Sequence, residues 1–170
     1  MDQPVPIAPG PGQESVWDYP RPPRLETTPK RLVVEHGGRI VGDTTRGLRV
    51  TETSQAPAYY LPEADIDLGL LRTATTRSFC EWKGTASYAD LVVEPGDGPA
   101  VVARAAAWTY LHPVEAFAAL VGHWSFFPQA VDRCLVDDEV VTPMEGGVYG
   151  GWVTPDIVGP IKGGPGTAYW

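Results

Sequence analysis

Short apolar runs separated by turn residues dominate the middle of the chain. Residues 32–35 and 39–43 are rich in aliphatic side chains, and they flank the turn signal at residues 36–38, which contains two glycines. Two such runs around a glycine pair predict a β-hairpin. Between residues 48 and 53 apolar and polar positions alternate, which is typical of a strand with one buried face.

The same kind of pattern predicts further strands along the chain. They cover residues 58–61, 77–83, 86–93, 100–110, 131–135 and 139–142. Gly84-Thr85 is the expected break between the strands at residues 77–83 and 86–93. Asp137-Asp138 is the expected turn between the strands at residues 131–135 and 139–142. The chain therefore reads as mainly β, with many short strands and tight turns.

One helix is predicted, over residues 114–122. Pro113 stands near its start, and Phe117, Leu120 and Val121 fall on one face at helical spacing. Residues 63–71 do not follow either period clearly, so they fit a short helical turn or a loop.

Proline and glycine set the two ends of the chain apart. Residues 1–28 contain seven prolines, so we expect an extended segment: either a solvated tail or an arm that packs Trp17 and Tyr19 onto the domain. Residues 144–170 are rich in glycine and aromatic side chains, and we expect an irregular arm with β-like pieces, packed on this subunit or a neighbour. The predicted organisation is a Pro-rich arm (1–28), a β domain (29–143) and a Gly/aromatic-rich arm (144–170).

Charge and cysteine content narrow the function classes. The chain has 21 acidic and 13 basic residues, a net charge of −8, so phosphate backbones are repelled and nucleic-acid binding is not expected. No stretch approaches the ~18 apolar residues of a membrane helix. The first twelve residues lack the basic and apolar runs of a signal peptide, and two cysteines do not suggest a secreted scaffold. We expect a cytoplasmic protein with neither nucleic acid nor membrane as a partner.

Three segments resemble the DUF427 family of domains of unknown function. They are residues 53–62 (TSQAPAYYLP), residues 80–88 (CEWKGTASY), and residues 107–110 (AWTY) followed by Pro113. The resemblance implies a mainly β, Mss4-like fold: a small β-tent or barrel of antiparallel strands around a central cavity. Together with the pattern above, we expect one short helix and long irregular termini. It implies no settled activity, and we expect no cofactor.

The resemblance also raises the question of a metal. Many β-tent relatives hold zinc with two Cys-x-x-Cys pairs, whereas this chain has only Cys80 and Cys134, in no such pair, and three histidines. A closed structural zinc site needs four ligands, mostly Cys or His. We therefore expect no metal site.

Residues 80–84 carry the most suggestive reactive groups. A nearby Lys83 would lower the pKa of the Cys80 thiol and make it a nucleophile. In a regular strand, however, Cys80 and Trp82 share one face while Glu81 and Lys83 share the other. The alternative is a small buried thiol beside a core tryptophan.

Aromatic residues gather around the same motifs. The set comprises Tyr59, Tyr60, Trp82, Tyr88, Trp108 and Tyr110. If their strands are neighbours, the rings line one cavity with Lys83 at its wall, and Arg49 or Arg72 could help to recognise an anionic or carbonyl group. An ordinary aromatic core is the alternative.

Asp65-Ile66-Asp67 has the spacing of carboxylates that hold Mg²⁺. A nucleotidyl-transfer activity is sometimes attributed to proteins of the DUF427 type, but such enzymes need a Gly-Ser element before the carboxylates, and none precedes Asp65. An exposed acidic turn is the simpler interpretation.

Three functional hypotheses follow. The first is a small-molecule-binding β domain with an aromatic-lined cavity near Lys83. The second is an enzyme that uses Cys80 or Lys83 in covalent or acid–base chemistry. The third is an interaction protein that self-associates through residues 144–170, in which case the protein would form a homodimer.

Overall fold

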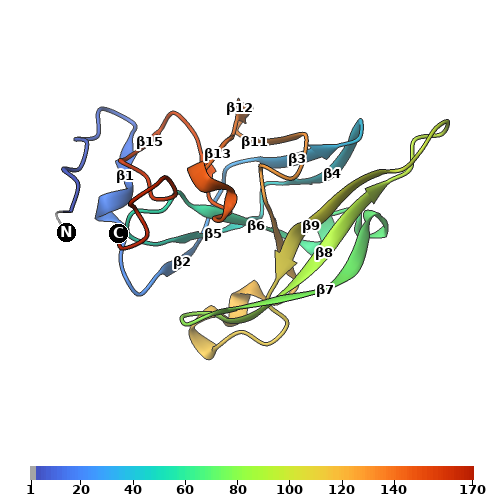
Figure 1. Ribbon diagram of the computed structural model, residues 1–170, viewed down its shortest axis with the longest axis horizontal. Coiled ribbons are helices and arrows are strands. Elements are labelled where there is room, and N and C mark those ends of the chain that lie inside the picture. Colours follow the sequence, from blue (N-terminus) through green and yellow to red (C-terminus); the bar gives the residue numbers. More distant parts are fainter. Residues whose placement is uncertain (1–2) are drawn as a thin grey trace.

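Antiparallel strands form most of the fold in the computed structural model, which describes residues 3–170 (Figure 1). The larger sheet has seven strands in the order β2-β5-β6-β10-β9-β8-β7. They are β2 (Arg24–Thr27), β5 (Leu48–Thr51), β6 (Ala58–Pro62), β7 (Leu71–Cys80), β8 (Gly84–Val93), β9 (Val101–Thr109) and β10 (His123–Phe126). This sheet is open, with β2 and β7 at its two edges, and its long strands β7, β8 and β9 run side by side in Figure 1.

A second sheet has four strands in the order β12-β11-β3-β4. They are β3 (Leu32–His36), β4 (Arg39–Thr44), β11 (Arg133–Val136) and β12 (Glu139–Val140). Two strand pairs involve the ends of the chain: β1 (Glu14–Ser15) runs parallel to β15 (Ile157–Val158), and β13 (Thr142–Pro143) runs antiparallel to β14 (Trp152–Val153). The predicted fold class, mainly β with antiparallel sheets, is confirmed.

The helical segments are all short 3₁₀ turns. They are η1 (Val16–Asp18), η2 (Glu63–Asp65), η3 (Leu68–Leu70), η4 (Glu115–Leu120) and η5 (Glu145–Gly147). The helix predicted over residues 114–122 is η4, which spans only six residues and is interrupted at Phe117 (φ −115°, ψ 18°). Val114 provides no side-chain cap, and so short a run does not sustain an α-helix by itself. Of the predicted apolar face, Phe117 and Leu120 are buried, whereas Val121 is exposed.

The hairpin of β7 and β8 differs from the expected boundaries. Its strands pair Cys80 with Gly84, so the turn consists of residues 81–83 and does not lie at Gly84-Thr85. Gly84 has a positive φ of 108°, a conformation that a glycine adopts without strain at the end of a short hairpin loop. Lys83 therefore lies outside the alternation of the strand, and the expected separation of its face from that of Cys80 does not apply.

Strand alternation divides the interior into clusters on the two faces of the large sheet. Tyr59 and Leu61 of β6 belong to the main core, which also contains Leu32 and Val34 of the four-stranded sheet. Tyr60, between them, belongs to a second cluster with side chains of β5 and β9. The main core thus fills the space between the sheets, and the second cluster covers the opposite face of β6.

Both terminal segments pack onto the domain. Val16 is fully buried and Tyr19 is 5% exposed, and the Trp17 indole donates to the carbonyl of Pro160 over 2.9 Å. Within residues 3–28, the arm packs Trp17 and Tyr19 onto the domain, whereas residues 5–13 are exposed. None of the helices in residues 3–170 is long and apolar enough to cross a membrane.

Candidate functional site: an aromatic cavity

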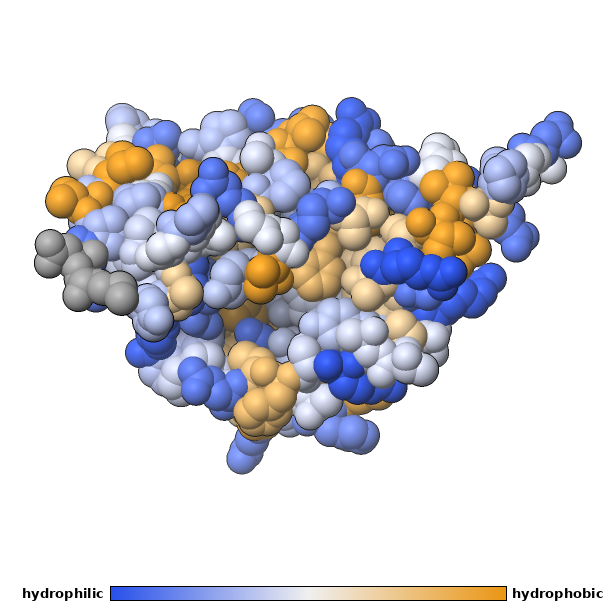
Figure 2. Space-filling model, in the orientation of Figure 1, coloured by the Kyte–Doolittle hydropathy of each residue, from blue (hydrophilic) through white to orange (hydrophobic). Residues whose placement is uncertain are grey.

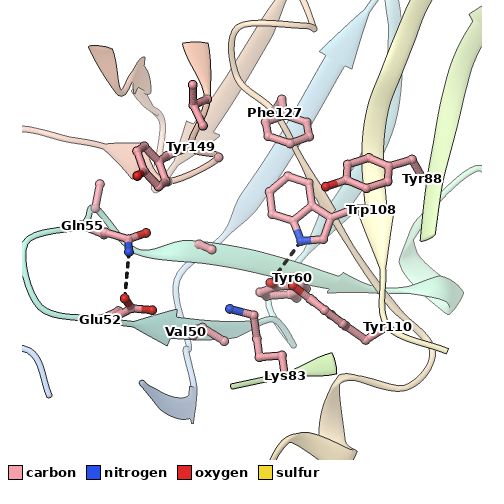
Figure 3. A pocket seen from close by; sticks show the side chains of 15 residues that line it. Val50, Glu52, Gln55, Tyr60, Lys83, Tyr88, Trp108, Tyr110, Phe127 and Tyr149 are labelled. Atoms are coloured by element: carbon pink, nitrogen blue, oxygen red, sulfur yellow. Dashed lines mark hydrogen bonds between the residues drawn. The ribbon is translucent and has the colours of Figure 1, made fainter. Parts of the chain in front are cut away.

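A cavity of about 180 Å³ lies on the face of the large sheet that carries the second cluster. Figure 2 shows this face of the molecule hollowed near its middle. The lining residues come from β5, the β5–β6 loop, β6, the β7–β8 turn, β8, the end of β9, the segment after β10 and the C-terminal arm. They are Val50, Glu52, Gln55, Ala56, Ala58, Tyr60, Lys83, Tyr88, Trp108, Tyr110, Phe127, Val148, Tyr149, Gly150 and Gly151. Segments distant in the sequence therefore build one concave site (Figure 3).

Aromatic rings form its inner wall. The Trp108 and Phe127 ring centroids are 4.4 Å apart, and Tyr88 stacks on Phe127 at 6.3 Å. Tyr60 meets Trp108 edge to face at 6.1 Å, and the Trp108 indole donates a hydrogen bond of 3.2 Å to the Tyr60 hydroxyl. These contacts fix the ring orientations, so the wall is formed before any ligand arrives.

The buried Tyr60 and Tyr110 hydroxyls remain neutral at physiological pH. Burial raises the pKa of Tyr60, which is 1% exposed, and burial also raises the pKa of Tyr110, which is 5% exposed. The Tyr88 hydroxyl lies 2.6 Å from the Ser78 hydroxyl. Each phenol can therefore donate as well as accept, which suits a carbonyl or carboxylate oxygen.

Lys83 places a positive charge at the wall. Its ammonium lies 5.8 Å from the centroid of the Tyr110 ring, and Figure 3 shows it pointing between Val50 and the tyrosines. No carboxylate in residues 3–170 lies within ion-pair distance of this ammonium. The Lys83 carbonyl accepts from the Val114 amide over 3.0 Å, which holds the turn in place. Its charge thus remains available to a ligand.

The carboxylate on the other side of the cavity is already compensated. Glu52 pairs with Arg21 at 3.2 Å and accepts a hydrogen bond of 2.9 Å from the Gln55 amide. The unbalanced charge facing the cavity is therefore positive, although the chain as a whole is acidic.

Five of the residues predicted from the sequence line this cavity. They are Tyr60, Lys83, Tyr88, Trp108 and Tyr110. Cys80 and Trp82 pack against the second cluster beside the cavity without lining it. The thiol candidate therefore does not face the same space as Lys83.

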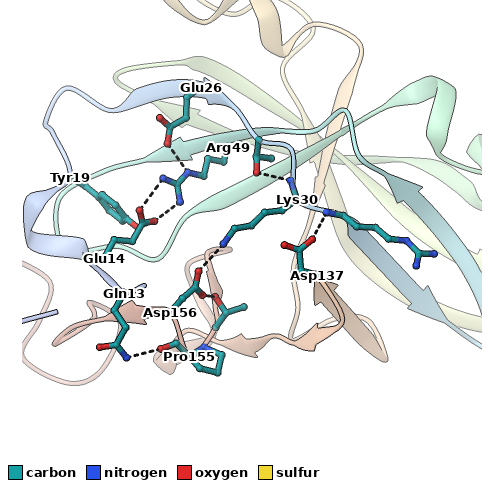
Figure 4. Close-up of polar contacts among 12 residues, drawn as sticks. Gln13, Glu14, Tyr19, Glu26, Lys30, Arg49, Asp137, Pro155 and Asp156 are labelled. Atoms are coloured by element: carbon teal, nitrogen blue, oxygen red, sulfur yellow. Dashed lines mark hydrogen bonds and ion pairs between the residues drawn. The ribbon is translucent and has the colours of Figure 1, made fainter. Parts of the chain in front are cut away.

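Three predicted residues lie elsewhere. Tyr59 points to the other face of β6, where its ring is 5.3 Å from that of Trp152. Arg49 is bound by Glu14 and Glu26 beneath the N-terminal arm (Figure 4). Arg72 donates to the carbonyls of its own segment.

Sequence reasoning missed Glu52, Gln55, Phe127 and the C-terminal lining residues. Gln55 belongs to residues 53–62, which carry the family resemblance, but nothing in that segment indicates that its side chain lines a cavity. The C-terminal lining residues could have been suspected from the glycine pair Gly150-Gly151, because adjacent glycines beside aromatic residues often mark a place where the backbone approaches other groups closely.

The two aspartates considered for Mg²⁺ are engaged in ion pairs. Asp65 pairs with Arg46 at 2.8 Å and accepts from the Thr44 hydroxyl, and Asp67 pairs with Arg39 at 3.3 Å. In the part of the chain that the structure describes, no group of three or more His, Cys, Asp or Glu side chains is arranged to hold a metal ion.

A second, larger groove of about 480 Å³ lies between the two terminal arms. Its lining is Ile7, Pro143, Met144, Glu145, Val153, Gly159, Pro160, Ile161, Gly164, Pro165, Thr167 and Trp170. This groove is apolar and presents no cationic side chain, so it lacks the directed polar groups that fix the orientation of a ligand.

Comparison with known families agrees with the motifs. Residues 24–137 match the domain of unknown function DUF427. The match includes the inner wall of the cavity and ends before the C-terminal lining residues. No curated protein matches the chain.

Proposed function

We propose that this protein, which belongs to the DUF427 family, binds a small anionic molecule in the aromatic cavity, with Lys83 as the counter-charge. The observation that carries the proposal is an ammonium without an ion-pair partner in residues 3–170, directed into a space walled by fixed rings. Ligand sites typically combine apolar walls with a few polar groups that set orientation.

The cavity volume limits what can bind. About 180 Å³ corresponds to roughly six water molecules at ~30 Å³ each, and a cavity of ~150 Å³ is known to hold benzene. Drug-sized ligands need ~300 Å³ or more. The proposed ligand is therefore a fragment-sized molecule whose charged group lies at Lys83.

The two rival hypotheses have less support. Covalent chemistry at Cys80 would need the thiol to face a substrate site, and Cys80 packs beside the cavity. Self-association through the C-terminal arm could use the exposed Tyr169 and Val148, but Trp152, the largest buried side chain of that arm, lies in the main core of the same chain.

A thermal-shift screen with matched variants tests the proposal. Fragments with anionic, neutral and cationic groups are compared on the wild-type protein and on Ala58→Leu, whose added methyl groups fill the cavity from β6. Ala100→Leu adds the same groups at an exposed position in the β8–β9 loop and serves as the control. Anionic fragments should raise the melting temperature of the wild type and of Ala100→Leu, but not of Ala58→Leu.

A second pair of variants tests the role of charge. Lys83→Met should weaken anion binding by about ten- to a hundredfold, the value of one charge-assisted hydrogen bond, while Arg77→Met, on the exposed edge strand β7, should leave it unchanged. Equal loss in both variants, or stabilisation of Ala58→Leu by the same fragments, would refute the proposal.

A further inference from the structure

We infer that residues 148–151, here called the strap, set the upper size of the ligand and restrict the cavity to single-ring aromatic acids. This inference rests on the proposed function and adds the ligand class and the residue that selects it. Tyr149 is the specificity-determining side chain. The strap lies outside the matched family segment, so this selection belongs to the C-terminal arm.

The strap is held at both ends. Met144 before it is 3% exposed, and Trp152 after it is fully buried with its indole donating to the Phe126 carbonyl over 2.9 Å. The Trp152 amide also donates to the Pro57 carbonyl over 2.8 Å. Between these anchors residues 145–148 are exposed, Tyr149 and Gly150 are half-buried and Gly151 is buried, so the strap runs along the rim of the cavity as a loop fixed at both ends.

The strap lies directly on the aromatic wall. A Cβ atom at Gly150 would come within 2.8 Å of Cζ3 of Trp108 and 3.2 Å of Cδ1 of Phe127. At Gly151 a Cβ atom would come within 2.7 Å of the Met144 sulfur. Only glycine permits this approach, because real Cβ atoms do not come so close to other heavy atoms. The backbone of the strap therefore closes one side of the space.

Tyr149 closes another side and is itself held from outside. The Lys162 ammonium lies 5.2 Å from the centroid of the Tyr149 ring. The Tyr149 carbonyl accepts a hydrogen bond of 3.2 Å from the side-chain amide of Gln129. Figure 3 shows Tyr149 on the side of the cavity opposite Trp108, near Gln55. A ligand between these walls meets ring faces and edges, which favours a flat aromatic molecule.

Volume and charge together define the class. The space of about 180 Å³ takes one aromatic ring with a carboxylate directed to Lys83, and a fused second ring would extend toward Tyr149 and the strap. Loss of the Tyr149 ring should open the cavity on that side and admit the second ring.

The test compares benzoate with 2-naphthoate by isothermal titration calorimetry at pH 7. The wild-type protein should bind benzoate more tightly than 2-naphthoate. In Tyr149→Ala the ratio of the two dissociation constants should shift toward 2-naphthoate by at least about tenfold, and Tyr149→Phe, which keeps the ring, should retain the wild-type ratio. Melting temperatures verify that each variant folds, and Tyr149→Leu replaces Tyr149→Ala if the latter does not.

Each outcome separates this inference from the proposed function. If both acids bind and their ratio is the same in all variants, the strap does not select size and this inference fails, while small-molecule binding stands. If neither acid binds the wild type or any variant, both the inference and the proposed function fail. A shift in Tyr149→Ala that Tyr149→Phe does not share supports the inference.

Discussion

At the scale of single residues, Arg49 connects the N-terminal arm to the domain. Its guanidinium donates to Glu26 over 2.6 Å and also pairs with Glu14, whose carboxylate accepts from the Tyr19 hydroxyl over 2.6 Å (Figure 4). Burial acts to raise the pKa of Glu14, but the hydrogen bonds from Arg49 and Tyr19 outweigh it and the pKa lies below its ordinary value of 4.5. Lys30 and Asp156 pair in the same region at 2.7 Å.

This network makes the stability depend on pH in the acidic range. A carboxyl group with a lowered pKa in the folded state stabilises the fold above its unfolded pKa, and that contribution is lost as the pH falls through the folded pKa. The free energy of unfolding should therefore decrease below pH 4.5, and Glu14→Gln should flatten this decrease. Urea denaturation at a series of pH values measures the effect. Glu94→Gln, at an exposed glutamate on the β8–β9 loop, should keep the wild-type slope; an equal change in both variants would contradict the assignment.

The two cysteines should differ in reactivity. Cys134 is 1% exposed and burial raises its pKa, so its thiolate is scarce and inaccessible, whereas Cys80 is half-buried. Iodoacetamide at pH 7.5 should modify Cys80 in the native protein and Cys134 only after unfolding, as mass spectrometry would show. Native labelling of Cys134 at the rate of a free thiol would contradict its place in the core.

The sequence predicted several of the residues that contribute to the candidate site, but not the side of the sheet to which each of their side chains points. Tyr59 and Tyr60 are adjacent in β6, so alternation sends one ring to the main core and the other to the cavity. Nothing in the sequence says which face is hollow. Arg49 was misplaced for the same reason: it follows Leu48 and precedes Val50, and its acidic partner Glu14 comes from a distant arm.

At the scale of elements, the tight turn between β11 and β12 carries local strain. Val136 pairs with Glu139, so Asp137 and Asp138 form a two-residue turn, and their φ values of 46° and 67° are both positive. Residues other than glycine are less favourable at a positive φ. At Asp137 this cost is offset by a hydrogen bond of 2.8 Å, which its carboxylate accepts from the Arg31 backbone amide.

Asp138→Gly should stabilise the protein by about 0.5–1 kcal/mol, because glycine relieves the positive φ and an Asp-Gly pair suits this turn. Asp138→Asn removes the same charge and serves as the control, with a smaller gain. Chemical denaturation measures both free energies of unfolding. A loss of stability in Asp138→Gly would mean that the turn does not have this geometry.

Element predictions succeeded where the pattern was local. The β3–β4 hairpin follows from two apolar runs around Gly37-Gly38, and both strands lie where expected. The η4 segment shows the limit: Phe117 and Leu120 have helical spacing, but the spacing alone does not reveal that the helix lacks a cap and the length to be regular.

At the scale of the whole molecule, the terminal arms are part of the fold. Backbone hydrogen bonds join Ile7 to Gly159 and Glu14 to Asp156, both over 2.8 Å, and Trp152 lies in the main core. Such contacts between opposite ends of the chain leave no local pattern in the sequence, which is why the path of residues 144–170 could not be predicted.

Trp152→Ala should therefore destabilise the entire domain. Removal of a fully buried tryptophan costs about 3–5 kcal/mol, and the Phe126 carbonyl loses its donor as well. Urea unfolding followed by circular dichroism should still show one transition, shifted to lower urea. Two separate transitions, or a loss below about 1 kcal/mol, would mean that the arm is not integrated into the core.

The most direct test of the central claim is to locate a bound acid by NMR. Benzoate is titrated into ¹⁵N-labelled protein, with the Trp108 indole N–H assigned through Trp108→Phe. The account predicts saturable shifts at that indole and at the amides of Tyr60, Lys83 and Gly150. Shifts confined to the groove at Met144, or no shifts at millimolar benzoate, would contradict it.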